Sequence, residues 1–359
     1  MRTQYPTSDI RTGPYALSDA ELEIAALIHT APQELQRLLR ARFAYEKRLR
    51  SVGCHKFSHV LDGGTKLHLK SGDTISESYY QQNQWVGIKT DPMGPPIRDV
   101  LLSHFAILGS KRWGARFYRS AGVTARNMTI SGVEEEHGWY ANISKTADPS
   151  TPAIWWDKVL VENVGSQVGQ FAYRPHETSD PEGDKDPDTG PLKFTNSLFR
   201  NFHLTTVEAD GTLTGGTRPA QTLQCKATPN DVLIDSCIWD NTAVPLSFGC
   251  LMVQGFSTEK DKLKNDGSLI DIDASHRKVY MNNSEMWTAP SQQKPMWFTD
   301  LASVWIEGGH FESQGGKEPI LDIERCKRVH IKGASGNLRV RIDGKDVGRI
   351  DKDYDHKWN

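Results

Sequence analysis

The sequence predicts an all-β protein: a right-handed, single-stranded parallel β-helix (a solenoid of short strands) over residues 120–345, with a short N-terminal helical segment that serves as a cap or an attachment. Three observations favour this fold. One short phrase of apolar residues spaced two apart recurs along the chain. Its last three copies are equally spaced, with 25 residues from Met281 to Ile306 and 25 from Ile306 to Ile331. The 359 residues also include 30 Gly and 18 Pro, which suits a turn-rich chain.

In each phrase, the alternation of a strand places two apolar residues on its inner side, and the small or amide residue that follows makes a corner. Stacked strands would then pair in parallel and bury a continuous aliphatic column. An all-β sandwich is the alternative, because it also has short strands and turns, but it does not predict equal spacing of like phrases. The phrases begin at Met128, Val159, Val232, Val279, Val304 and Val329.

Four segments follow from these patterns: a helical segment over 1–56, an irregular first β section over 57–119, the parallel β-helix over 120–345 and a tail over 346–359. In the first segment, Ser18 has Glu21 at capping-box spacing, and Pro32 divides the helical pattern in two. This segment is either a cap over the first coil or a docking element for a partner.

Composition excludes several classes of protein. Lys and Arg total 43 against 45 Asp and Glu, a net charge of -2, so no overall positive field is available for nucleic acid. No apolar stretch is long enough to span a membrane, and no apolar run follows the first arginine, so we expect synthesis in the cytoplasm without a signal peptide. Five cysteines without a C-x-x-C pair are expected to be reduced and mostly buried.

The recurring phrase resembles that of the pectate-lyase-like superfamily of right-handed β-helices, which includes polysaccharide lyases, glycoside hydrolases and phage tailspikes. The likeness covers residues 120–345 and is one of architecture. It implies a polysaccharide or a cell-surface glycan as partner. The stretch from Val304 to His310 is similar to the V-W-I-D-H phrase of pectate lyases, but Glu307 and Gly308 stand where Asp and His would, so no catalytic role is transferred.

The first candidate site is the dense segment from Glu134 to Tyr140, directly after a strand. Crowded carboxylates there would favour a protonated general acid, which makes Glu136 and His137 candidate catalytic residues, with Trp139 as a sugar-binding ring. The alternative is a solvated acidic turn.

The second candidate site brings together residues before and after one predicted coil. Aromatic rings beside acidic and amide groups are what a sugar-binding groove requires. The alternative is that the tryptophans close the core. The candidates are Asp157 and Glu177 as catalytic residues, and Trp155, Trp156, Tyr173, Arg174 and His176 as substrate-binding residues. Trp239, Trp287 and Trp305 are expected on an outer face, where a ligand, a loop or an oligomer interface would cover them.

A metal site is the third candidate. Asp184, Asp186 and Asp188 resemble the start of a calcium loop, because a turn would gather their carboxylate oxygens. Gly190 is one position late and Thr195 stands where the last carboxylate would, so a solvated acidic loop is the alternative. The sequence indicates no required cofactor, and calcium is the only ion it suggests.

These observations favour a virion surface or tail component, a spike or decoration protein with carbohydrate-facing loops, with or without depolymerising activity. Such a protein would be a homotrimer and would meet a virion partner through residues 1–50. The alternative is a pectate-lyase-like polysaccharide lyase or glycoside hydrolase that acts on an acidic or neutral glycan. A third alternative is a structural solenoid without a ligand. The oligomeric state and a convergent carboxylate pair would discriminate among them.

Overall fold

The chain divides into two compact units, Met1–Val52 and Gly53–Asn359. The computed structural model describes residues 59–62, 67–68, 72–83, 86–90, 96–133, 136–144, 146, 148–164, 167–172, 189–200, 206–207, 213–214, 221–226, 231–241, 249–255, 277–288, 294–313 and 319–357. The predicted N-terminal helices lie outside these ranges. The described residues form strands and turns and contain no helix.

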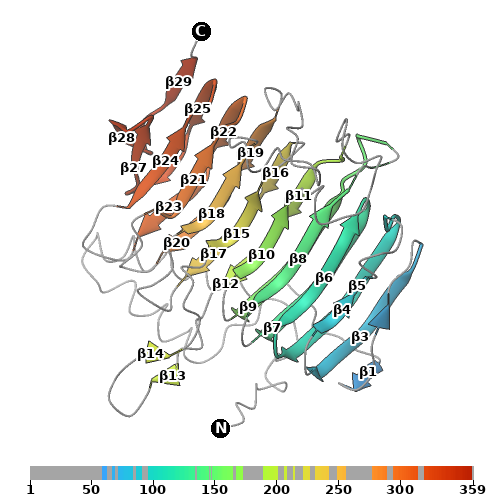
Figure 1. Cartoon of the computed structure of the whole chain (residues 1–359). Helices are drawn as coiled ribbons and strands as arrows, with labels where there is room; N and C mark the ends of the chain where they lie inside the picture. The colour runs from blue at the N-terminus through green and yellow to red at the C-terminus, as the bar shows by residue number, and fades with distance from the viewer. Residues whose placement is uncertain are drawn as a thin grey trace, which may run out of the picture. The chain divides into compact units, whose positions relative to one another are not determined.

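A 16-stranded sheet is the larger of two extended sheets in the described part of unit Gly53–Asn359 (Figure 1). Its strands are β1 (His59–Asp62), β3 (Thr74–Asn83), β5 (Val100–Ser110), β7 (Val123–Val133), β9 (Ile154–Val164), β11 (Leu192–Thr195), β12 (Leu198–Arg200), β16 (Val232–Asp235), β17 (Ile238–Asn241), β19 (Lys278–Asn282), β20 (Glu285–Thr288), β22 (Ser303–Glu307), β23 (His310–Ser313), β25 (Arg328–Lys332), β26 (Ser335–Gly336) and β29 (Tyr354–Lys357).

The second extended sheet has 11 described strands, and a separate antiparallel pair joins β13 (Thr206–Val207) to β14 (Leu213–Thr214). The strands of the 11-stranded sheet are β2 (Leu67–His68), β4 (Val86–Lys89), β6 (Trp113–Ser120), β8 (His137–Ile143), β10 (Gln167–Ala172), β15 (Gln221–Lys226), β18 (Gly249–Gln254), β21 (Met296–Thr299), β24 (Ile320–Glu324), β27 (Arg339–Ile342) and β28 (Lys345–Arg349).

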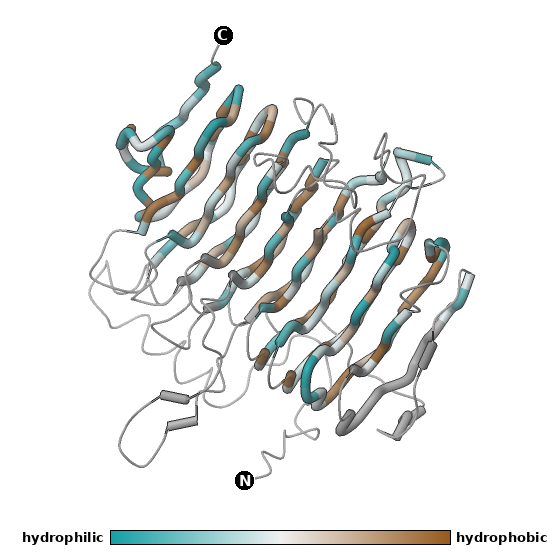
Figure 2. The backbone as a smooth tube through the Cα atoms, in the orientation of Figure 1, coloured by the Kyte–Doolittle hydropathy of each residue, from teal (hydrophilic) through white to brown (hydrophobic). Residues whose placement is uncertain are grey.

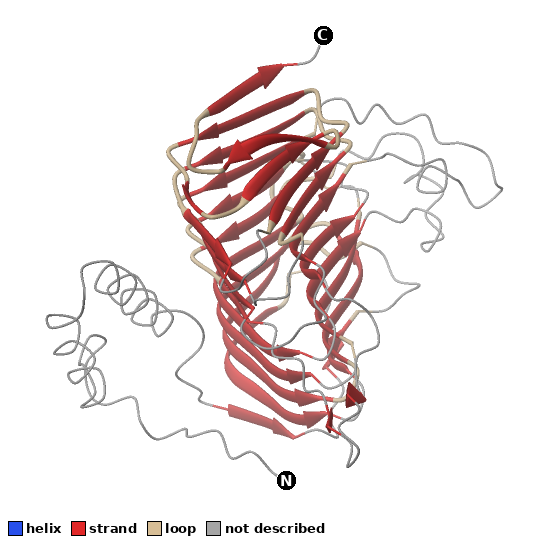
Figure 3. Cartoon of the chain, turned by 90° about the vertical axis from the view of Figure 1, so that its left-hand side faces the viewer, coloured by secondary structure: helices blue, strands red, loops and turns tan. Residues whose placement is uncertain are grey.

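The chain passes back and forth between these two sheets. Strands β5, β7 and β9 lie in the larger sheet, while β6, β8 and β10 lie in the smaller one, and each pairs in parallel with the next strand of its own sheet. The larger sheet takes two strands per passage from β11 onward, and Figure 3 shows the strands of unit Gly53–Asn359 in facing layers. Antiparallel pairing enters these sheets where β28 meets β27 and β29 meets β25. This largely parallel all-β arrangement is compatible with the predicted β-helix.

A column of residues with positive φ makes one corner of the larger sheet. Each follows an outward residue of a paired strand, so the chain turns at the same place in every layer. Asn and Gly tolerate this left-handed conformation better than most residues, because the short side chain of Asn hydrogen-bonds locally and Gly has no Cβ. The prediction that Asn, Asp, Ser or Gly after the phrase makes the corner is confirmed for the last four phrases, at Ser236, Asn283, Gly308 and Gly333, whereas Asn127 and Lys158 precede the phrases at Met128 and Val159. The column comprises His104, Asn127, Lys158, Asn196, Ser236, Asn283, Gly308 and Gly333.

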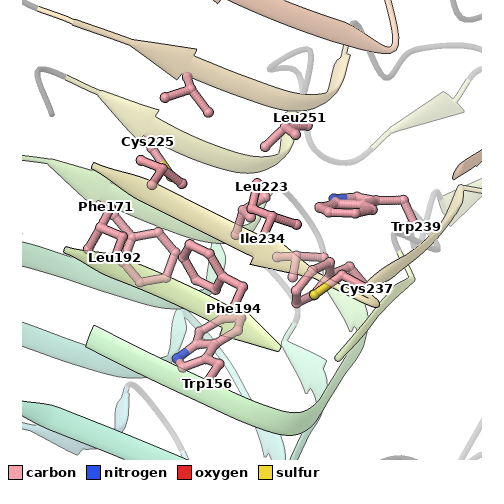
Figure 4. Packing of buried hydrophobic residues seen from close by; sticks show 14 of the residues in the cluster. Trp156, Phe171, Leu192, Phe194, Leu223, Cys225, Ile234, Cys237, Trp239 and Leu251 are labelled. Atoms are coloured by element: carbon pink, nitrogen blue, oxygen red, sulfur yellow. The ribbon is translucent and has the colours of Figure 1, made fainter. Parts of the chain in front are cut away.

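The core lies between the two sheets. Figure 2 shows apolar residues recurring along the strands, as expected when one side of each strand is buried. Phe171 of β10 and Phe194 of β11 meet at 5.1 Å between ring centroids, and Trp156 of β9 packs edge-on against both, at 5.4 and 5.5 Å (Figure 4). All three side chains are fully buried, so rings from both sheets close this part of the core.

The predicted register of the last three phrases is confirmed: Met281 pairs with Ile306 and Ile306 with Ile331, and all three are fully buried. The phrase at Val159 behaves differently. Val161 lies beyond the corner and pairs with Phe199 of β12, whereas Ile234 pairs with Phe194 of β11. The two phrases are therefore not equivalent, because β9 runs on past the corner and contributes an inner row on each side of it.

The prediction of an outward Trp239 is wrong. Trp239 is fully buried, belongs to the core and stands in register with Met286, which in turn pairs with Phe311. The alternation restarts after the corner at Ser236, which makes Trp239 the inward residue of β17. Trp287 is 6% exposed and lies outside the core cluster.

Candidate functional site

The most prominent outward-facing feature lies on β11, β16, β19, β22, β25 and the first half of β9. The inward residues of these strands are apolar residues two apart, so the residue between each pair points outward. The register stacks these middle residues into one column across six strands. We call it the aromatic column: Trp155, Lys193, Leu233, Tyr280, Trp305 and His330, all partly exposed.

One end of the aromatic column is a stack of three rings. Trp305 lies between Tyr280, at 6.4 Å with an interplanar angle of 22°, and His330, at 4.5 Å. The guanidinium of Arg328 lies 4.6 Å from the centre of the Trp305 ring. The indole nitrogen of Trp305 donates to Ser303 Oγ at 3.0 Å, so the polar atom of the ring already has a partner within the sheet. The indole is thus held in place without any need for a ligand at its nitrogen.

The other end of the column is a tryptophan flanked by cations. Arg126 and Lys193 each lie 4.5 Å from the centre of the Trp155 ring, on neighbouring strands. The nitrogen of Trp155 donates to Thr195 Oγ1 at 3.3 Å. Cations over an indole face are attracted by its quadrupole, and here they also supply positive charge beside a partly exposed ring.

An acidic column runs parallel to the aromatic one, two residues further along each strand, beside the corner. Its members, in register, are Asp157, Thr195, Asp235, Asn282, Glu307 and Lys332. Carboxylates alternate with neutral or basic groups in this order. Since neighbouring strands are about 4.8 Å apart, consecutive carboxylates stand on backbones about 9.6 Å apart. The column thus offers hydrogen-bond acceptors and donors at regular spacing.

Asp157 is held firmly within the acidic column. Its Oδ1 accepts hydrogen bonds from Thr195 Oγ1 at 2.9 Å and from Asn196 Nδ2 at 3.0 Å, both on the next strand and its corner. Trp155 and Asp157 point to the same side of β9, so the structure brings together these two residues of the second predicted site.

Two predicted sugar-binding residues lie elsewhere. Trp139 and Trp156 are fully buried and belong to the core cluster. Their rings meet each other at 5.2 Å and cannot contact a ligand from these positions, so the prediction for them is wrong and the core alternative holds. The physical reason is that Trp155 and Trp156 are consecutive on one strand, and only one of two consecutive residues can face outward.

Glu136 and His137 lie at the start of β8, on the smaller sheet. Glu136 accepts a hydrogen bond from Arg112 Nε at 2.9 Å, and its other oxygen is 4.0 Å from His137 Nε2. The His137 ring stacks on Tyr140 at 5.9 Å. The described surroundings of Glu136 are therefore cationic and aromatic. The site is separate from the aromatic column, which belongs to the larger sheet.

Several candidates fall outside the described residues: Tyr173, Arg174, His176, Glu177, Asp184, Asp186 and Asp188. No group of three or more His, Cys, Asp or Glu side chains suited to a metal ion occurs in the described ranges. Within the same ranges, no helix could cross a membrane.

The sequence pattern predicted a ligand-facing Trp155 and an outward Trp305. It did not predict that both belong to one column with Lys193, Tyr280 and His330. The signal was present: four members of the column are the middle letters of the recurring V-x-I and V-x-M phrases. Comparison of the chain with protein-family models, with curated proteins and with solved structures found no match.

Proposed function

We propose that the chain is a right-handed parallel β-helix whose aromatic and acidic columns bind a glycan. The aromatic column carries this proposal, because indole and phenol rings present flat apolar surfaces on which the C-H faces of a sugar pack. The acidic column beside it offers carboxylate, hydroxyl and amide groups for the sugar hydroxyls. Six strands at about 4.8 Å span about 24 Å from first to last, which suits an extended oligosaccharide better than a single sugar.

Such a protein fits a virion-type spike or decoration component of the pectate-lyase-like kind, assembled as a homotrimer. Outward rings that a glycan leaves bare would be covered by neighbouring subunits in such an assembly, since exposed apolar patches favour association. The mass of the purified chain by light scattering tests this part. A mass near three times 40.3 kDa supports it, and a mass near 40.3 kDa would favour a monomeric glycan-active protein.

Cleavage of the glycan is the second candidate function. It is favoured by Asp157 and Asp235, which stand two strands apart in the acidic column, about 9.6 Å between backbones. Inverting glycoside hydrolases hold two carboxyl groups about 6.5–9.5 Å apart, and flexible side chains at this backbone spacing can reach that range. Release of reducing ends from a bound polysaccharide, abolished in Asp157→Asn and in Asp235→Asn, would support cleavage over binding alone.

Binding itself is tested by screening an array of neutral and acidic oligosaccharides, followed by titration of the best glycan. Trp305→Ala and Trp155→Ala should each weaken affinity at least about tenfold, the factor that 1.4 kcal/mol produces. Trp297→Ala is the matched control, because Trp297 is also partly exposed and also lies near a cation, Lys294 at 5.0 Å, but belongs to the smaller sheet. Equal losses in all three variants, or in none, would contradict the proposed face.

A further inference from the structure

A second group of reactive side chains lies beyond the corner, on β23 and β26. His310 and Glu312 are two residues apart on β23 and therefore share its outer side, while Phe311 between them is fully buried. Ser335 of β26 is the register partner of His310. The topology thus brings a hydroxyl, an imidazole and a carboxylate to one exposed place on the larger sheet.

These three side chains form a continuous hydrogen-bonded chain. Ser335 Oγ lies 3.0 Å from His310 Nδ1, and His310 Nε2 lies 2.8 Å from Glu312 Oε2. The His310 and Glu312 side chains are each 23% exposed, and Ser335 is exposed. When His310 Nε2–H donates a hydrogen bond to the Glu312 carboxylate, Nδ1 keeps its lone pair and faces the serine hydroxyl. This is the order of nucleophile, base and orienting carboxylate that activates a serine.

The backbone holds this chain in place. Ser335 Oγ is also within 3.0 Å of the Gly309 carbonyl oxygen, so its hydroxyl proton has two acceptors and turns from one to the other by a bond rotation. Gly309 and Gly336 both have positive φ, and a Cβ at Gly336 would collide with the Phe311 carbonyl. The two strands therefore approach closely at this point because these positions are glycine, which fixes Ser335 opposite His310.

We propose that Ser335 is the nucleophile, and His310 the general base, of an esterase activity directed at small acyl esters, with Glu312 as the positioning residue. An ester is the favoured substrate class because its alkoxide leaves more readily than the amine of an amide. The ring of Trp287, 5.0 Å from that of His310, packs beside the imidazole and borders the site. The site is independent of the proposed glycan-binding columns, which lie on the other side of the corner.

The reaction balances without a cofactor. Ser335 Oγ bonds to the ester carbonyl carbon as its proton passes to His310 Nδ1. The carbon–oxygen bond of the ester then breaks, and the same proton passes to the leaving alkoxide. Water attacks the acyl-serine, gives its proton to Nδ1, and the carboxylic acid leaves as that proton returns to Oγ.

A nearly matched arrangement elsewhere in the chain serves as the control. Ser103 Oγ lies 2.9 Å from His104 Nδ1, but the group near His104 Nε2 is the amide of Asn127, at 3.4 Å. Within the described part of the chain, Ser103 therefore has a neighbouring imidazole whose other nitrogen contacts an amide and not a carboxylate. If the carboxylate matters, Ser335 should react with a serine-directed reagent and Ser103 should not.

The experiment treats the full chain with diisopropyl fluorophosphate and locates the adduct by peptide mass spectrometry, with p-nitrophenyl acetate hydrolysis measured in parallel. We expect one adduct, on Ser335, and loss of hydrolysis in Ser335→Ala but not in Ser103→Ala. His310→Ala should slow labelling at least about 100-fold. Glu312→Gln should slow it similarly, while Glu312→Asp, which keeps a carboxylate, should retain a larger rate than Glu312→Gln.

An adduct elsewhere, no adduct on the native chain, or hydrolysis that persists in Ser335→Ala would overturn the proposal. The mapping needs only the native protein, so a variant that fails to fold does not prevent the decision. Glycan affinity should be unchanged in Ser335→Ala, and labelling unchanged in Trp305→Ala, which separates this proposal from the glycan-binding one.

Discussion

The rings of Trp305 and His330 lie 4.5 Å apart on the outer side of β22 and β25, in register across the sheet. His330 Nε2 is 3.9 Å from Glu307 and its Nδ1 is 3.9 Å from Asp355, so an aromatic surface and two carboxylates meet at one residue. Only 17% of the His330 side chain is exposed. The contact joins the aromatic column to the acidic one and shows how stacking strands in register turns one repeated sequence position into a surface.

Because the aromatic column faces outward, its residues should matter less for stability than their inward neighbours. Trp305→Ala should cost less than about 1.5 kcal/mol of unfolding free energy, whereas Trp156→Ala, which empties a site among Trp139, Phe171 and Phe194, should cost about 3–5 kcal/mol. Urea unfolding followed by circular dichroism measures both. A Trp305→Ala cost as large as that of Trp156→Ala would mean that Trp305 is a core residue.

The buried cysteines should be unreactive in the folded protein. Cys225, Cys237, Cys250 and Cys326 are buried thiols, as the sequence predicts, while Cys54 lies outside the described residues. Burial raises the pKa of Cys326 to about 12 and raises that of Cys225 further. At pH 8 both are therefore neutral thiols, and the thiolate is the reactive form.

Ellman's reagent at pH 8, with peptide mapping of the modified sites, should leave all four described cysteines unmodified in the native protein and modify them in urea. Rapid native reaction at Cys225 or Cys326 would contradict their burial. Because burial raises the pKa of both thiols, their protonated form favours folding below the ordinary thiol pKa near 9. That contribution to stability is lost progressively as pH rises above this value.

A buried carboxylate ties two strands of the smaller sheet together. Asp322 has no exposed side-chain surface, accepts hydrogen bonds from Arg341 Nε at 2.9 Å and Arg341 Nη2 at 2.5 Å, and lies 2.5 Å from Lys294 Nζ. Burial alone would raise the pKa of Asp322, but the hydrogen bonds and charges of Arg341 and Lys294 outweigh it and lower that pKa.

Arg341→Met should therefore destabilise the protein by about 1–3 kcal/mol near neutral pH, less than for a fully buried pair because Arg341 is partly exposed and Lys294 remains. A carboxyl group with a lowered pKa contributes stability above its ordinary value and loses it as pH falls through the folded one, so the two proteins should converge in acid. Arg339→Met is the control: its pair with Asp346 is exposed on both sides, and we expect less than about 1 kcal/mol. Equal effects would contradict the importance of burial.

We expect opposite effects on stability from substitutions at two of the positive-φ residues that form the corner. Lys158 has a φ of 56° and an exposed side chain, so Lys158→Gly should relieve backbone strain and stabilise the protein by up to about 1 kcal/mol. Gly308 has a φ of 66°, and a Cβ there would come within 2.6 Å of Asn283 Oδ1, so Gly308→Ala should cost about 1–2 kcal/mol. Thermal unfolding of both variants tests this, and a stabilising Gly308→Ala would refute the assigned backbone conformation.

The inward residues of the strands and the positions of the later corners could be assigned from the pattern of residues alone. Apolar residues two apart must share one side of a strand, and the residue after them must tolerate a left-handed turn, so Val304, Ile306 and Gly308 could be assigned without coordinates. Equal spacing of 25 residues then determined that Met281, Ile306 and Ile331 stack, and the structure confirms this pairing.

The alignment of the earlier layers and the side chains that meet across strands were not predictable and come from the folded chain. Val161 and Ile234 carry the same local pattern but lie on opposite sides of the corner, because register depends on the length of the intervening loops, which periodicity does not record. Trp239 could not be told from an outward ring, because the alternation of inward and outward residues restarts after the corner at Ser236. Ser335 and His310 are one 25-residue repeat apart, so the period already pairs them, as it pairs Ile306 with Ile331. That the serine hydroxyl, the imidazole and the Glu312 carboxylate join in one hydrogen-bonded chain is seen only in the folded structure, because it depends on how the side chains of paired strands lie.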